Sequence, residues 1–353
     1  DPLANLFWTK ARKPWQALAF CFEWAGFCRE GYAYVSCLPV QMDGSCNGLQ
    51  NFSALLRDEV GGTAVNLVPM GAPQDVYQRV MDSVVPVVEA DAAGHPDPKT
   101  RAIAQGWLGH CTREVGKRPV MTFSYGACRQ GYWEQIGDDI VDRWTEVFPG
   151  AALPWEDKAA AARYMGDRIW EAVGKVVIKA AEAMQWLQAV AAIASDQGLP
   201  VRWTTPAGLV VQQHYQLIKG ARVNLTFGGK LVRPRVNRSV VGIDKRRQKN
   251  GIAPNFVHSL DAAHLMLTVL AAGERGLHSF SVIHDSYGTH AGKAAELARI
   301  LREQFITMYT PDLLQKFRDE ILEQLPPGHT LPPVPERGSL DLEQIRESVF
   351  FFS

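Results

Sequence analysis

Residues 280–286 read Phe-Ser-Val-Ile-His-Asp-Ser, a short apolar run that ends in three polar side chains. The run predicts a β-strand with Asp285 at its end. Residues 32–40 form a second predicted strand, which leads to Asp43 and Gly44. If the two strands are neighbours in one sheet, the two carboxylates meet although 242 positions separate them in the chain. This pairing decides the fold.

Two carboxylates at adjacent strand ends suit one kind of chemistry. Such a pair can bridge two Mg²⁺ ions about 3.5–4 Å apart, which is the arrangement used for in-line displacement at phosphorus. Gly44 has no side chain, so its backbone carbonyl can approach an ion. The alternative is that each aspartate is structural, because an Asp before a Gly is a common turn residue.

The composition excludes several classes of protein. The chain has 353 residues, of which 46% are hydrophobic and 21% charged, so it can bury a large core and is not disordered. No apolar run reaches the roughly 18 residues that a membrane span needs, and no membrane partner is expected. The six cysteines form no C-x-x-C pair and no secretory signal precedes them, which favours reduced thiols in an intracellular protein. The chain begins with Asp1, which suggests that it is part of a longer product.

Common catalytic motifs are missing. The sequence has no G-x-G-x-x-G or G-x-x-x-x-G-K-[ST] phosphate loop and no G-x-S-x-G elbow. His284, Asp285 and Ser286 are consecutive and cannot converge as a serine triad. His258, Asp261 and His264 share one predicted helix, but a six-residue spacing does not place both imidazoles on one face for zinc.

Helical periodicity dominates the rest of the chain. Glycines 61 and 62 are expected to stop the first of these helices, and Pro119 to interrupt the second. Helices are predicted at about 51–60, 100–133, 164–195, 255–272 and 294–309. Residues 201–236 alternate as strands do, and five prolines make 326–335 an extended connector.

Within the second predicted helix, Arg113, Lys117, Met121 and Tyr125 recur at four-residue steps. Side chains at this spacing form a slowly drifting stripe along one helix face. Arg113 and Lys117, at one end of the stripe, would neutralise a triphosphate. Met121 and Tyr125, at the other end, would line the pocket for a base and a sugar. The alternative is a solvated basic patch that runs into an ordinary packing stripe.

A hairpin is predicted around Gly228-Gly229. Val223, Leu225 and Phe227 alternate with Arg222, Asn224 and Thr226, and the return strand carries Lys230, Arg233 and Arg235. Lys plus Arg equals Asp plus Glu, at 37 each, yet residues 230–249 hold eight basic residues against one acidic. A ribbon with a basic face fits a major groove and a polyanion. The alternative is a solvated edge hairpin whose charges prevent aggregation.

Four motifs in this order resemble the single-subunit DNA-directed RNA polymerases of bacteriophages and mitochondria. They are Asp43-Gly-Ser-Cys-Asn-Gly-Leu-Gln50, Lys117-Arg-Pro-Val-Met-Thr-Phe-Ser-Tyr-Gly126, Gly251-Ile-Ala-Pro-Asn-Phe-Val-His-Ser259 and Ile283-His-Asp-Ser-Tyr-Gly288. The resemblance extends to Arg57–Gly62, to residues 222–236 and to Phe350–Ser353. Residues 13–16 and 247–251 are closer to the mitochondrial branch.

The resemblance implies an α+β, mostly helical right-hand polymerase, with an antiparallel palm sheet and a helical fingers insertion. Residues 1–60 would be the first part of the palm. Residues 61–257 would be the fingers, including a recognition hairpin at about 215–240. Residues 258–353 would complete the palm and form a C-terminal extension. The amino-terminal domain, the thumb and the start of the palm that the family has upstream are not in these residues.

The resemblance also implies residue roles. Asp43, Asp285 and the Gly44 carbonyl would hold two Mg²⁺ ions, with His284 beside them. Arg113 and Lys117 would bind the nucleotide's phosphates, Met121 would line its pocket, and Tyr125 with His258 would favour ribonucleotides. Tyr77 would lie near the template, and Arg222, Asn224, Arg233 and Arg235 on the promoter-reading hairpin. The C-terminal Phe350–Ser353 would pack back towards the metals.

The expected activity is template-directed transfer of ribonucleotides from NTPs to an RNA 3′-hydroxyl, with release of pyrophosphate. The expected partners are promoter and template DNA, the RNA transcript and the absent upstream part of the polymerase. The protein would act in a host cytoplasm if it comes from a phage, or in the mitochondrial matrix or another organelle.

Two alternatives remain open. One is a related right-hand DNA polymerase, whose second carboxylate motif usually runs His-Asp-Glu, whereas Ser286 follows Asp285 here. The other is a nucleic-acid-binding fragment without a working catalytic centre, which needs an upstream polypeptide.

Overall fold

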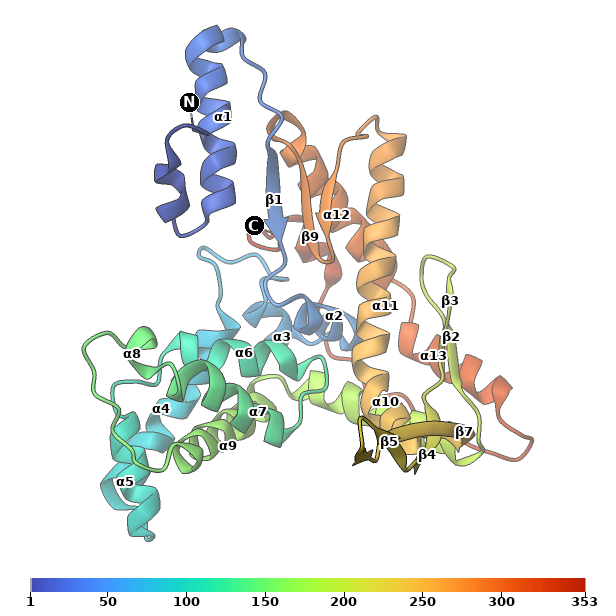
Figure 1. Cartoon of the computed structure of the whole chain (residues 1–353). Helices are drawn as coiled ribbons and strands as arrows, with labels where there is room; N and C mark the ends of the chain where they lie inside the picture. Colours follow the sequence, from blue (N-terminus) through green and yellow to red (C-terminus); the bar gives the residue numbers. More distant parts are fainter. Residues whose placement is uncertain (1, 353) are drawn as a thin grey trace.

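The computed structural model describes residues 2–352, without the side chains of residues 237 and 238. A small antiparallel sheet and a larger group of helices lie at different levels along one long helix, α11 (Lys245–Glu274) (Figure 1). The mostly helical α+β fold is as predicted.

The small sheet combines distant parts of the chain. Strands β1 (Pro39–Asp43), β8 (Ser281–Ile283) and β9 (Ser286–His290) form it in the order β1-β9-β8, with both pairs antiparallel. The β8 strand agrees with the prediction. The predicted strand at 32–40 was too long, because β1 begins only at Pro39, where it gains β9 as a partner. The 3₁₀ turn η2 (Gly31–Ala33) replaces its first residues.

Helix α11 forms the core of the structure. It packs against α2 (Asn47–Leu56), α10 (Ile178–Asp196) and α12 (Ala294–Tyr309). Asp244 caps its start by accepting a hydrogen bond from the Arg247 N–H, so the helix begins ten residues before the predicted 255. Its length and apolar composition would also allow a membrane span. However, core helices share both properties, and Phe256 and Leu260 are buried here among the described residues.

The group of helices contains α4 (Val76–Gly94), α5 (Pro98–Trp107), α6 (Arg113–Phe123), α7 (Arg129–Ile136), α8 (Trp144–Val147) and α9 (Lys158–Val176). The single helix predicted at 100–133 is three helices, since Gly109 and Gly126 adopt positive φ angles of 75° and 78° between them. Pro119 lies inside α6 and does not end it. The helix predicted at 164–195 is also divided, because α9 and α10 meet at an angle of 96°.

The first predicted helix, at 51–60, is divided as well. Arg57 has a φ angle of 54° and separates α2 from α3 (Glu59–Ala64). Gly61 and Gly62 lie inside α3 and do not stop it. Gly62 stands where a side chain would meet Leu340 at 2.9 Å, so close packing explains this glycine.

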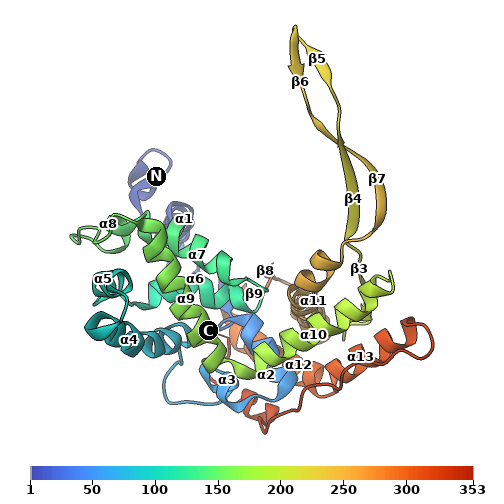
Figure 2. The same ribbon diagram turned by 90° about the horizontal axis from the view of Figure 1, so that it is seen from below.

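A long two-stranded ribbon projects from the fold next to the start of α11 (Figure 2). Its strands are β4 (Gln216–Arg222) paired with β7 (Arg235–Ile243), and β5 (Leu225–Phe227) paired with β6 (Lys230–Val232) around the predicted Gly228-Gly229 turn. Its base lies beside a second hairpin of β2 (Val201–Thr204) and β3 (Val210–Gln213). Phe227 is 82% exposed at the tip, so the apolar face that the sequence shows is not packed against the described protein.

The remaining segments are terminal. At the N-terminus, α1 (Pro14–Glu30) packs on η1 (Leu6–Lys10) and η2. At the C-terminus, α13 (Leu313–Gln324) is followed by the predicted extended connector and by η5 (Leu342–Arg346). The predicted domain boundaries at 60/61 and 257/258 fall inside α3 and α11, so the division into palm and fingers stays a prediction.

Candidate active site

Asp43 and Asp285 lie at the same end of the small sheet. In the β1–β9 register, the Cα partner of Asp43 is Ser286, the residue directly after Asp285. His284 and Asp285 form the two-residue turn between β8 and β9, and His284 has a positive φ angle of 55°. Partial burial raises the pKa of the Asp43 carboxyl above its usual value, and the charge of Asp285 raises it further. The two carboxylates are therefore near enough to repel each other.

A cavity of about 580 Å³ opens beside this pair. It is lined by Tyr125, His258, Asp261, Ala262, Leu265, His284 and Asp285. The rings of Tyr125 and His258 stand 4.7 Å apart between centroids. Burial lowers the pKa of the His258 imidazole below its usual 6.5, so the ring is largely neutral at pH 7. Burial also raises the pKa of the Tyr125 hydroxyl, which remains protonated.

Asp261 is a residue that the sequence analysis missed. Its Oδ1 accepts hydrogen bonds from the side-chain amides of Asn47, inside the Asp43 motif, and Asn51, directly after it, both on α2. Burial raises the pKa of the Asp261 carboxyl to about 7. A signal was present, because Asp261 lies one helical turn after His258, but the sequence analysis used it only to argue against a zinc site.

The stripe on α6 does not face a single cavity. Arg113 forms an ion pair with Asp75 and lies over the Tyr77 ring at 5.1 Å, and all three line a cavity of about 380 Å³ that Gly44 also borders. Lys117 and Met121 line another cavity, of about 520 Å³. Tyr125 lies beyond the end of the helix. The predicted continuous stripe is wrong in this respect, because α6 ends at Phe123.

Lys117 differs from its neighbours in having no ion pair or hydrogen bond among the described residues. The nearby Arg118 is paired with Asp139 at 2.6 Å. Lys117 therefore has an ammonium group without a direct partner that can contact a ligand, whereas the charge of Arg113 is already partly neutralised by Asp75.

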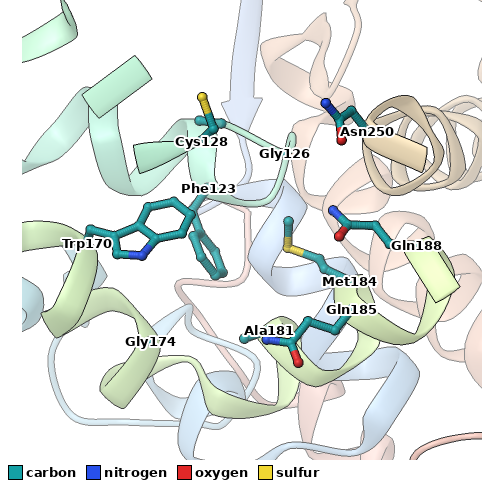
Figure 3. A pocket seen from close by; sticks show the side chains of 11 residues that line it. Phe123, Gly126, Cys128, Trp170, Gly174, Ala181, Met184, Gln185, Gln188 and Asn250 are labelled. Carbon is teal, nitrogen blue, oxygen red and sulfur yellow. The ribbon is translucent and has the colours of Figure 1, made fainter. Parts of the chain in front are cut away.

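A further cavity of about 360 Å³ borders the turn after Tyr125 (Figure 3). Gly126 and Cys128 form part of one wall, and Trp170, Met184 and Gln188 contribute from α9 and α10. A side chain at Gly126 would meet Pro254 at 3.3 Å, so α11 approaches this turn closely.

The residues predicted on the hairpin lie apart from the carboxylates. Arg222, Asn224, Arg233 and Arg235 are exposed on the projecting ribbon (Figure 2). Arg222 and Arg235 are Cα partners across β4 and β7, which concentrates positive charge at one level of the ribbon.

Comparison with known proteins decides the family. The family model described as DNA-dependent RNA polymerase matches residues 1–331. The chain belongs to this family. It is 38% identical to the DNA-directed RNA polymerase of Enterobacteria phage T3 and to T7 RNA polymerase of Escherichia phage T7, in each case over 100% of the chain and 44% of the relative. It is 37% identical to the human mitochondrial DNA-directed RNA polymerase over 98% of the chain and 28% of that protein.

The chain thus spans less than half the length of these polymerases. The family resemblance predicted from the four motifs is confirmed. The relatives include both phage and mitochondrial enzymes.

As predicted for this polymerase family, the C-terminus packs against the first carboxylate motif. Phe352 forms a β-bridge with Gly44, and the Gln50 amide donates to the Phe351 carbonyl at 2.9 Å. Ser353 lies outside the described residues. The Gly44 loop is consequently fixed between α2 and the end of the chain.

The donor set suits a hard divalent cation. Asp43 and Asp285 supply carboxylate oxygens, and Gly44 could add its carbonyl. Among residues 2–352, no group of three or more His, Cys, Asp or Glu is arranged as a metal centre. Mg²⁺ commonly binds through one or two carboxylates together with substrate phosphates and water, so a site of two carboxylates fits this ion.

Proposed function

We propose that this chain is the catalytic region of a DNA-dependent RNA polymerase, which transfers ribonucleotides from NTPs to an RNA 3′-hydroxyl and releases pyrophosphate. The observation that carries the proposal is the meeting of Asp43 and Asp285 across β1 and β9 in a chain of this family. Tyr125 and His258 stand beside them in one cavity, where a nucleotide would bind.

Asp43 and Asp285, with the Gly44 carbonyl, would hold two Mg²⁺ ions. When bound, these ions lower the pKa of the attacking 3′-hydroxyl and stabilise the leaving pyrophosphate. Asp43, whose pKa is raised by burial and by the charge of Asp285, would hold an ion in its ionised form. His284 lies in the same turn as Asp285 and would border the ions.

Lys117 and Arg113 would hold the β- and γ-phosphates in line with the 3′-hydroxyl. Lys117 is unpaired among the described residues, whereas Arg113 would have to share its charge with Asp75. Met121, which lines the cavity with Lys117, would contact the nucleotide. Tyr125 and the largely neutral His258 would recognise the 2′-hydroxyl, because groups placed to bond a hydroxyl stay unpaired with a deoxy substrate.

The DNA would contact two further regions. Tyr77, whose ring lies under Arg113 near the Gly44 loop, would stand near the template. The ribbon with Arg222, Asn224, Arg233 and Arg235 would read promoter bases, since a two-stranded ribbon fits the major groove and its arginines contact phosphates and guanines.

We also propose that a polypeptide corresponding to the upstream part of the relatives completes the enzyme. Helix α1 supports this, because Trp15, Phe20 and Trp24 are 76%, 60% and 56% exposed, and the helix packs mainly on its own flanking turns. An apolar surface of this kind is typical of an interface. The site of action would be the host cytoplasm for a phage enzyme, or the mitochondrial matrix or another organelle for a cellular one.

Primer extension with the upstream polypeptide added tests the proposal. We expect Mg²⁺-dependent incorporation of rNTPs, at least a thousandfold loss in Asp43→Asn or Asp285→Asn, and no change in the control Asp319→Asn, which replaces an exposed carboxylate on α13. Near-normal extension by either site variant would refute the assignment. A preference for dNTPs would indicate a DNA polymerase, and absence of any incorporation would indicate a non-catalytic fragment.

A further inference from the structure

The carboxylate of Asp261 has one oxygen in use and one free. Oδ1 accepts the Asn51 amide at 2.5 Å and the Asn47 amide as well. Oδ2 has no hydrogen bond within the described part of the protein, and Asp261 lines the same cavity as Tyr125, His258 and Asp285. An ionised carboxylate is an acceptor only, so the open oxygen calls for an O–H or N–H donor from a ligand.

Hydrogen bonds on the side of Asp261 away from its free oxygen hold this carboxylate in one orientation. The hydroxyl of Tyr309 on α12 donates to Asn51 Oδ1, which turns the Asn51 amide nitrogen towards Asp261. The same nitrogen lies 3.3 Å from Asn47 Oδ1. Asp261 therefore joins α2, α11 and α12, and its free oxygen is preorganised rather than left on a mobile side chain.

The chemistry of the cavity limits what the donor can be. A negative carboxylate repels the triphosphate, whose cationic partner Lys117 lines a different cavity. Sugar hydroxyls are neutral donors, and carboxylates commonly bind ribose hydroxyls in nucleotide sites. We propose that Asp261 Oδ2 accepts a hydrogen bond from a ribose hydroxyl beside Tyr125 and is a specificity-determining residue for ribonucleotides. This inference rests on the proposed function.

Equilibrium binding to the unaltered 353-residue chain and to Asp261→Asn tests the inference. At pH 8 and with Mg²⁺, dissociation constants would be measured for an NTP, its 2′-deoxy and 3′-deoxy analogues, and tripolyphosphate. Two short RNAs, one ending in a ribonucleotide and one in a 2′-deoxynucleotide, distinguish the RNA end from the incoming nucleotide as the source of the hydroxyl. Asn keeps the acceptor for Asn47 and Asn51 but presents an amide instead of Oδ2.

We expect Asp261→Asn to reduce the preference for ribose over deoxyribose by roughly tenfold in one of two arms: the comparison of nucleotides or the comparison of RNA ends. Tripolyphosphate, which has no sugar, should bind equally well, which also shows that the variant is folded. Tyr309→Phe is the matched comparison, because it removes a hydrogen bond that supports Asp261 but keeps the free oxygen, so its ribose preference should fall by less than that of Asp261→Asn.

An unchanged preference in Asp261→Asn in both arms would overturn this inference while the proposed function stands. An equal loss for all ligands, tripolyphosphate included, would also overturn it, since that result indicates a purely structural role. Failure of the unaltered chain to bind any nucleotide, even with the upstream polypeptide added, would overturn the proposed function together with this inference.

Discussion

Gly48 on α2 lies against the ring of Tyr125. A methyl group on Gly48 would stand 3.3 Å from the ring carbon Cζ of Tyr125 and 2.1 Å from the Oγ of Ser124. The first carboxylate motif thus reaches the end of the Lys117–Gly126 motif by direct backbone packing. The position of Tyr125 depends on a glycine that lies 77 residues before it in the chain.

This contact predicts the effect of Gly48→Ala. The added methyl cannot fit without moving Ser124 and Tyr125, so we expect a loss of about 1–3 kcal/mol in the free energy of unfolding and a weaker preference for rNTPs over dNTPs. Denaturant unfolding and competitive extension measure the two effects. Gly273→Ala is the control, because nothing lies within 4 Å of the added atom and the helix should become no less stable. A fully stable and selective Gly48→Ala would contradict the packing.

Lys117 gives a second prediction. Because this ammonium group has no partner among the described residues, Lys117→Met should leave the melting temperature unchanged within error. Nucleotide affinity should fall by at least tenfold, since one charge-assisted contact to a phosphate is lost. The matched comparison is Arg118→Met, which breaks an exposed ion pair with Asp139 and should alter affinity little. Equal effects of the two substitutions would argue against a special role for Lys117.

The raised pKa of Asp261 predicts a pH-dependent stability. The folded chain binds this proton more tightly than the unfolded chain, in which the pKa is near 3.8. The contribution to stability is therefore complete below pH 3.8 and is lost as the pH rises to about 7. Asp261→Asn does not titrate, so its stability relative to the unaltered chain should increase by roughly 2–3 kcal/mol from pH 5 to pH 8.

Denaturant unfolding without Mg²⁺ at several pH values measures this difference. A constant difference for Asp261→Asn would show that the Asp261 carboxyl is not shifted.

The ribbon predicts a change in salt dependence. Each phosphate contact that is lost reduces the slope of log K against log[salt] by about 0.9. Arg222→Gln with Arg233→Gln should therefore make the slope for duplex DNA less negative by roughly 1–2. Lys316→Gln with Arg346→Gln removes the same charge from α13 and η5, remote from the ribbon in the sequence, and should leave the slope unchanged. Equal slopes for the two double variants would show that the ribbon does not contact phosphates.

The local pattern of the sequence was sufficient for the parts of the fold that depend on neighbouring residues. The strand before Asp285, the Gly228-Gly229 hairpin and the helix at 294–309 follow from periodicity and turn residues. The four motifs were sufficient for the family. Helix ends were predicted less well, because Gly61, Gly62 and Pro119 lie inside helices that tertiary packing supports.

The tertiary structure decided which distant groups share a cavity. Only the β1–β9 register brings Asp43 next to Asp285, and only the end of α6 at Phe123 separates Tyr125 from Lys117. The role of Asp261 depends on amides from α2 and a hydroxyl from α12, a three-helix contact that no local spacing encodes. Periodicity reports the conformation of a segment, whereas burial and hydrogen bonding across the fold determine which side chains meet and how they titrate.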